Sequence, residues 1–272
     1  MRGETSRLRI DIPTLIALAA LAWILVNVSH EIVGHAGSAA LLGMPINAVS
    51  TTTADIQWVQ GLPAGAYSTF YAAGTLVNLL GGAAALALLR WGRRAHAATR
   101  TFLWLFATFS LVIVTMNLVS ASLIGAGDWT EFSRHLEHQD VWRAVIMGVG
   151  LIITIGGYVM PLRTFLPDLR DHRRAQLTLT VIPVVTLMVV QSLSLIGSPF
   201  VRLPSAANHL LACVFAYLHF VLWAILVNAL PAPRSRHPAE SIQLPRSRGW
   251  LAIGLVLVLL YLVVLGPGVG SA

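Results

Sequence analysis

Seven long apolar segments fill most of this 272-residue chain and restrict it to a membrane-embedded fold. Crossing the hydrocarbon core of a bilayer takes about 20 predominantly apolar residues in an α-helix. The segments lie at 12–42, 64–89, 101–125, 141–162, 176–197, 206–230 and 249–267. Only 11% of the residues are charged, against about 25% in soluble domains. The sequence therefore predicts an all-α, polytopic membrane helix bundle with about seven transmembrane helices, six being the lower count, and no soluble domain.

Arginine supplies every basic side chain other than histidine, because the chain contains no lysine, and the net charge is +7. The arginines gather before the first segment and in alternate loops, around 90–100, 163–174 and 234–248. Cytoplasmic loops carry an excess of basic residues. This pattern predicts an integral protein of a bacterial cytoplasmic membrane with a cytoplasmic N-terminus. Since the charge lies in short loops, we expect no nucleic-acid partner.

Ionisable residues end the first apolar segment, in the string His30-Glu31-Ile32-Val33-Gly34-His35. Charged side chains at membrane depth are costly and usually functional. Two histidines flanking a glutamate can hold Zn²⁺ and activate its water. The histidines are five residues apart, which a regular α-helix would rotate by about 140°. A single π-turn between about 29 and 36 would return them to one face, and Gly34 tolerates that distortion.

A third metal ligand is needed, because a catalytic zinc keeps three protein ligands and one open position. The candidate is Asp128, in the Gly-rich stretch 125–129 at the end of the third apolar segment. The predicted topology places it on the side of the membrane that the first helix approaches. Two readings without a metal stay open: Asp128 as a helix N-cap, and Glu31–His35 as a hydrogen-bonded pair.

Three sequence motifs resemble those of the site-2 protease family of intramembrane zinc metalloproteases. The string at 30–36, followed by Ala39-Ala40-Leu41-Leu42-Gly43, is similar to its first motif, HExGHxxxA with a hydrophobic-Gly step. Gly74-Thr75-Leu76-Val77-Asn78 is similar to its second, a Gly-Pro-x-x-Asn turn. Asn117-Leu118 followed by Asp128 is similar to its third, an Asn…Asp-Gly segment. The resemblance covers roughly residues 20–130.

The chain departs from these motifs at three places. One residue is inserted in the first motif, giving HExxxH, as in the soluble dipeptidyl peptidase III family. Thr75 replaces the usual proline of the second motif. In the third motif Gly127-Asp128-Trp129 replaces Asp-Gly, at a longer distance from Asn117.

The resemblance implies a function and a role for each site residue. His30, His35 and Asp128 would bind Zn²⁺, and Glu31 would be the general base. Asn78 would hydrogen-bond the substrate backbone or the oxyanion, although a buried amide joining two helices is an equal alternative. The implied activity is that of a zinc metallopeptidase, which hydrolyses peptide bonds of membrane-anchored protein or peptide substrates within the lipid bilayer.

Two other functions remain open from the residues alone. The same centre could hydrolyse lipid amides or esters, or the chain could be a non-catalytic metal-binding membrane protein or transporter. Glu31 favours a hydrolase, because a transporter has no need of a carboxylate beside a ligand histidine. We divide the chain into a zinc-site membrane core at 1–130 and further spans at 131–272, with a flexible linker at 231–248. The segment 43–63 is expected to be a short extended or re-entrant piece, and the oligomeric state is left open.

Overall fold

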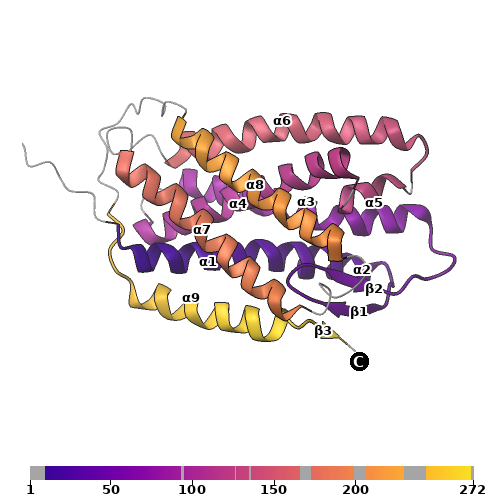
Figure 1. Ribbon diagram of the computed structural model, residues 1–272, viewed down its shortest axis with the longest axis horizontal. Helices are drawn as coiled ribbons and strands as arrows, with labels where there is room; N and C mark the ends of the chain where they lie inside the picture. The colour runs from indigo at the N-terminus through magenta and orange to yellow at the C-terminus, as the bar shows by residue number, and fades with distance from the viewer. Residues whose placement is uncertain are drawn as a thin grey trace, which may run out of the picture.

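The computed structural model describes residues 10–92, 95–125, 127–134, 136–165, 173–198, 206–229 and 243–270. These residues form an elongated bundle whose long helices run lengthwise (Figure 1). The helices are α1 Ile12–Val28, η1 Ser29–Ala36, α2 Gly37–Leu41, α3 Ala64–Trp91, α4 Ala97–Ile124, α5 Asp128–Arg134, α6 Gln139–Phe165, α7 Arg173–Gly197, α8 Ala206–Ala229, α9 Arg248–Leu260 and η4 Tyr261–Leu265. The strands are β1 Ile46–Val49, β2 Ala54–Ile56 and β3 Val269–Gly270.

The long helices coincide with the apolar segments of the sequence. Within the described residues, six are long and apolar enough to cross a membrane, and α8 carries a shorter apolar stretch, Cys213–Ala229. The first span runs unbroken from Ile12 to Leu41 through α1, η1 and α2. The expectation of an all-α membrane bundle is confirmed. The proposed linker at 231–248 lies mostly outside the described residues, which resume at 243.

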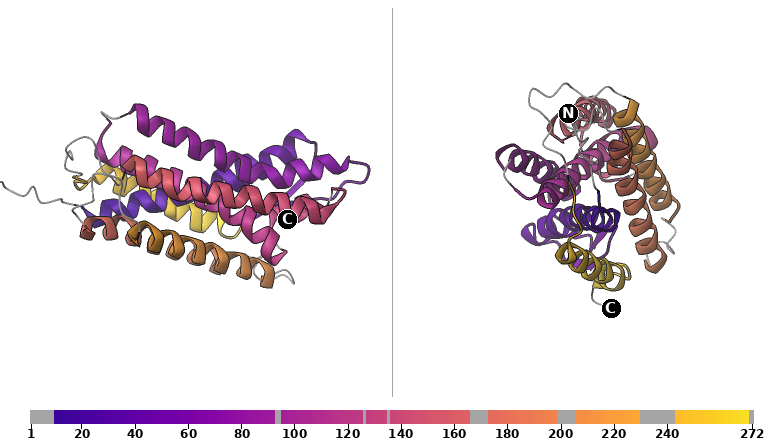
Figure 2. Two further views of the ribbon diagram at one scale, coloured as in Figure 1. Left: turned by 90° about the horizontal axis from the view of Figure 1, so that it is seen from above. Right: turned by 90° about the vertical axis from the view of Figure 1, so that its left-hand side faces the viewer.

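α1 and α4 form the centre of the bundle, and α6 and α9 lie at its periphery (Figure 2, right). The main apolar core joins α1, α4, α7, α8 and α9 around large side chains such as Trp23, Trp104 and Trp223. The outward faces of α6, α7, α8 and α9 expose many leucines, isoleucines and valines. In a chain of this composition such faces suit contact with lipid.

The segment 43–63 forms a β-hairpin, which agrees with the expected extended piece. β1 pairs antiparallel with β2 and with β3, giving the strand order β2-β1-β3. β3, which follows η4 near the C-terminus, was not foreseen. It brings the end of the last helix against the hairpin, where the backbone N–H of Thr51 donates to the carbonyl of Leu265 at 3.2 Å.

The two ends of the bundle differ in composition. One end holds the start of α1, α4, α7 and α9 and the close of α3 and α8 (Figure 1). Among described residues it carries Arg90, Arg100, Arg173, Arg174, Arg246 and Arg248. The opposite end holds the sheet and α5, with Arg134 and Arg143 nearby. This separation agrees with the alternation of arginine-rich loops along the sequence; which end faces the cytoplasm stays a prediction.

Candidate metal centre

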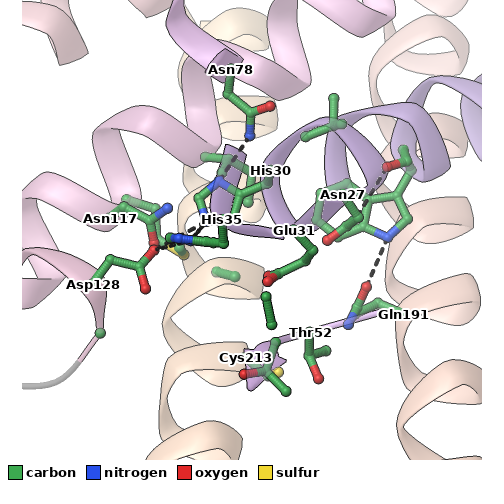
Figure 3. Close-up of a pocket in the computed structure, with 18 of the residues that line it drawn as sticks. Asn27, His30, Glu31, His35, Thr52, Asn78, Asn117, Asp128, Gln191 and Cys213 are labelled. Atoms are coloured by element: carbon green, nitrogen blue, oxygen red, sulfur yellow. Dashed lines mark hydrogen bonds and ion pairs between the residues drawn. The ribbon is translucent and has the colours of Figure 1, made fainter. Parts of the chain in front are cut away.

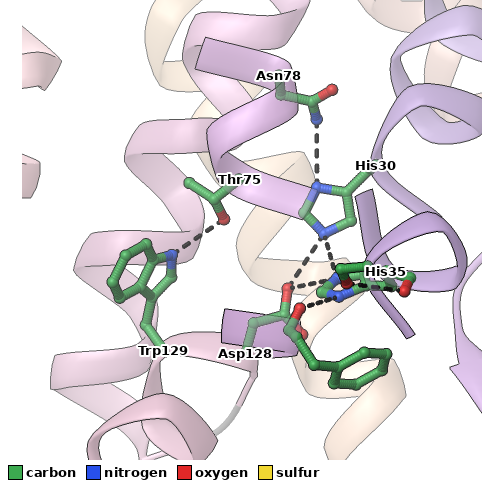
Figure 4. A network of polar contacts seen from close by, with 8 residues as sticks. His30, His35, Thr75, Asn78, Asp128 and Trp129 are labelled. Atoms are coloured by element: carbon green, nitrogen blue, oxygen red, sulfur yellow. Dashed lines mark hydrogen bonds and ion pairs between the residues drawn. The ribbon is translucent and has the colours of Figure 1, made fainter. Parts of the chain in front are cut away.

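The two histidines of the first span lie on one face of the helix because the helix is locally a π-helix. This wider turn covers Ser29–Ala36, and the N–H of Gly37 bonds the carbonyl of Ile32, five residues earlier. It brings Nε2 of His30 and Nε2 of His35 to 3.2 Å from each other (Figure 4). The π-turn predicted from the five-residue spacing is confirmed.

Asp128, the first residue of α5, completes a triangle with the two imidazoles. Its Oδ2 lies 3.1 Å from Nε2 of His30 and 3.3 Å from Nε2 of His35. A tetrahedral zinc with bonds of about 2.0–2.1 Å separates its ligand atoms by about 3.3 Å. The triangle therefore has the size that a metal ion requires, and its two nitrogens and one oxygen form a group that could hold one.

A glycine on α3 leaves room for the triangle. A Cβ atom at Gly74 would lie 2.6 Å from Nε2 of His35 and 2.7 Å from Nε2 of His30. Gly34 on η1 packs directly on the backbone of Gly74, so that a Cβ at Gly34 would lie 2.5 Å from the Gly74 Cα. Small residues permit such close helix crossings in membranes. Any side chain at position 74 would fill the space that the metal ligands converge on.

The second nitrogen of each imidazole also has a partner, which orients the ring. Nδ1 of His35 donates to the carbonyl of Phe70 at 2.8 Å, which leaves the lone pair of the neutral ring on Nε2. Nδ1 of His30 lies 3.3 Å from Nδ2 of Asn78, a fully buried residue of α3. Within the described part of the chain, Oδ1 of Asn78 has no hydrogen-bond partner.

Both histidines of the centre are buried, and Asp128 is partly buried. His30 is 8% exposed and His35 is 4% exposed. Burial by itself would raise the pKa of the Asp128 carboxyl, but attraction to His35 and hydrogen bonds from both imidazoles outweigh it when the rings are protonated, which is the form they give up on binding a metal. The pKa of Asp128 consequently lies well below its ordinary range. The carboxyl group is therefore an anion, which suits it to bind a cation.

Glu31 shares a cavity with the triangle. The cavity has a volume of about 250 Å³ and is lined by residues of α1, η1, the loop before β2, α3, α4, α7 and α8. His30, Glu31, His35, Asn78 and Asp128 all line it, so the structure brings every site residue predicted from the sequence together. Figure 3 shows the Glu31 carboxylate pointing into the cavity, on the side that faces Thr52 and Cys213.

Two residues that line the cavity were not predicted from the sequence. Gln191 of α7 lines the cavity. Its side-chain oxygen accepts hydrogen bonds from Nε1 of Trp23 at 3.0 Å and from the Tyr261 hydroxyl at 3.2 Å. A glutamine in an otherwise apolar segment was the available signal. Cys213 of α8 is half-buried and also lines the cavity wall. Its apolar surroundings in the sequence gave no sign of that position.

Comparison with known proteins adds no assignment. Neither the family models, nor the curated proteins, nor the solved structures contain a match to this chain. Any function must therefore be inferred from the chemistry of the centre itself.

Proposed function

We propose that this protein is an intramembrane zinc metalloprotease that hydrolyses peptide bonds of membrane-anchored substrates. The observation that carries the proposal is that Glu31 and the ligand triangle line one cavity inside a membrane-spanning bundle. A structural ion pair would need only the histidines and Asp128. A glutamate that lines the same cavity is the additional group that hydrolysis requires.

The donor set favours zinc as the ion. Two imidazole nitrogens and one carboxylate oxygen are ligands that zinc accepts, and three protein ligands leave one position open. Zinc in such a site lowers the pKa of the water that it binds and polarises a carbonyl group. Metal binding through Nε2 of His30 needs its proton on Nδ1. A half-turn of the Asn78 amide would place Oδ1, which now has no partner among the described residues, against that proton.

Side chains that line the cavity would carry out the proton transfers and limit access of water. Glu31 would accept the proton of the attacking water and deliver it to the leaving nitrogen. Apolar wall residues of α4 such as Ile113 and Met116 would limit water around the reacting groups. Asn78 as a contact to the substrate oxyanion stays a prediction, because the contact present in the structure is with His30.

The surroundings of the cavity favour a substrate that is itself in the membrane. Its walls come from spans α3, α4 and α7 and from η1 and α8, whose outer faces are apolar. A substrate segment in the bilayer can reach such a site by lateral movement, whereas a soluble protein would have to enter the bundle. A zinc hydrolase of lipid amides or esters is the competing function.

Glu31→Gln tests the proposal, with Glu131→Gln as a matched control. Glu131 pairs with Arg134 on α5 and does not line the cavity. The purified proteins are reconstituted in vesicles with a set of quenched single-span peptides, and products are identified by mass spectrometry. We expect cleavage by the wild type and by Glu131→Gln, and loss of cleavage with zinc retained in Glu31→Gln. If the peptides stay intact while vesicle lipids are hydrolysed, the protease proposal is wrong and the lipid hydrolase is favoured.

A further inference from the structure

A hydrogen bond beside the metal ligands joins α5 to α3. Nε1 of Trp129 donates to Oγ1 of Thr75 at 2.9 Å (Figure 4). Thr75 is only 2% exposed. The Trp129 ring packs against Phe132, with 4.8 Å between the ring centroids, and against an apolar cluster that includes Val114 and Leu118. The bond is therefore partly shielded from water, which limits competition for it.

The position of Asp128 depends on such a contact, because its own segment is weakly determined. α5 has seven residues, and a helix this short has little stability of its own. The chain enters it through Gly125 and Gly127, which have φ values of 64° and 93°. Glycines with positive φ allow many backbone conformations. Asp128 can therefore stay at 3.1 Å and 3.3 Å from the two imidazoles only if neighbouring residues hold α5 in place.

The bond between Trp129 and Thr75 lies where it can hold α5 in place, beside both Asp128 and the histidines. Trp129 directly follows Asp128, and Thr75 directly follows Gly74, whose missing side chain leaves space for both imidazoles. One turn of α3 thus contacts the histidines at Gly74 and carries the anchor of the third ligand at Thr75. A shift of α5 along α3 would break this bond and, at the same time, move Asp128 away from the histidines.

Thr75 and Trp129 are also two of the positions at which the sequence departs from the motifs it resembles. Proline in place of Thr75 would offer no hydroxyl, and glycine in place of Trp129 would offer no indole N–H. The structure brings the two departures into one hydrogen bond. The two side chains satisfy each other, since an indole N–H shielded from water without an acceptor would be unfavourable.

We propose that Thr75 and Trp129 form a positioning pair that holds Asp128 as the third metal ligand. The inference rests on the proposed metal site. Removing either member should weaken metal binding through Asp128 while the two histidines and the fold remain. Partners of metal ligands typically change metal affinity by about 10–100-fold when they are lost.

Zinc affinity of the purified full-length protein, measured by competition with a chromophoric chelator, tests this pair. Thr75→Val and Trp129→Phe remove the acceptor and the donor with little change of shape. We expect each to weaken zinc binding about 10-fold and the double variant to lose no more than either one. Thr75→Ser, which keeps the hydroxyl, should bind zinc as the wild type does. Thr69→Val on the same helix, and Trp142→Phe, on the exposed face of α6, are the matched controls.

The Asp128→Ala background separates positioning from a general effect on the bundle. There, Thr75→Val should cause no further loss of zinc affinity, because the residue that it positions is gone. A further loss in that background would overturn the proposal, as would wild-type affinity in both Thr75→Val and Trp129→Phe. If Thr75→Val does not fold, the comparison of Trp129→Phe with Trp142→Phe decides the matter in the same way. A wild-type protein that binds no zinc would overturn the metal site itself, which is a different result from an intact site insensitive to the pair.

Discussion

Gly34 of η1 and Gly74 of α3 are in backbone contact at the point where the two helices cross. A Cβ atom at Gly34 would lie 2.5 Å from the Cα of Gly74 and 2.7 Å from its nitrogen. The crossing places α3 directly against the π-turn, so that its next turn reaches His30 through Asn78. The geometry of the metal centre therefore depends on two positions at which no side chain is tolerated.

Gly74→Ala should abolish metal binding. The added methyl group would lie 2.6 Å and 2.7 Å from the two Nε2 atoms, closer than contact allows, so the imidazoles must separate. Gly65→Ala is the control, because a Cβ at Gly65 on the same helix meets nothing within 4 Å. Bound metal per chain, measured by mass spectrometry after gel filtration, should fall to background in Gly74→Ala alone. Equal metal content in the two variants would contradict the described packing.

Asn78 is expected to orient His30, and its variants should show this in the metal affinity. Asn78→Leu removes the hydrogen-bond partner of Nδ1 and should weaken zinc binding about 10–100-fold. Asn78→Asp keeps an acceptor oxygen for the Nδ1 proton and should retain zinc. Asn228→Leu controls for loss of a hydrogen-bonded, half-buried asparagine away from the cavity, since Asn228 bonds Thr180 and Ala224. Unchanged affinity in Asn78→Leu would restrict Asn78 to a contact with substrate.

The metal centre should be reached from the extracytoplasmic side. The arginine-rich end of the bundle is expected in the cytoplasm, and the sheet and α5 lie at the other end. In a Cys213→Ser background, an impermeant thiol reagent on intact cells should label Gln60→Cys and spare Gln243→Cys. Both positions are exposed in the structure, at opposite ends of the bundle. Labelling of Gln243→Cys alone would reverse the orientation.

The spans and the histidine pair could be predicted because each depends on local sequence. Apolar length sets the extent of a membrane helix, and the segment predicted at 206–230 is the helix Ala206–Ala229. The spacing of His30 and His35 sets their angle on a helix, and only a π-turn makes that spacing compatible with one metal ion. Asp128 followed from its place at the end of the third apolar segment and from the resemblance, and the structure places it beside both histidines.

The remaining features depend on tertiary contacts that no local pattern reveals. Tyr261 meets Gln191 at 3.2 Å although 70 residues separate them. β3 has only two residues, and its pairing with β1 follows from where α9 and η4 end rather than from strand-forming sequence. The bond between Thr75 and Trp129 joins two helices, and neither residue alone suggests the other.

The bound metal of the purified protein tests the central claim most directly. The claim is that His30, His35 and Asp128 together hold one metal ion. Elemental analysis of wild type purified without added metal, with anomalous scattering at the zinc edge for its position, should find about one zinc per chain within the triangle. His35→Ala should contain none. A wild type without metal, or a His35→Ala variant with the same zinc content as the wild type, would contradict the account.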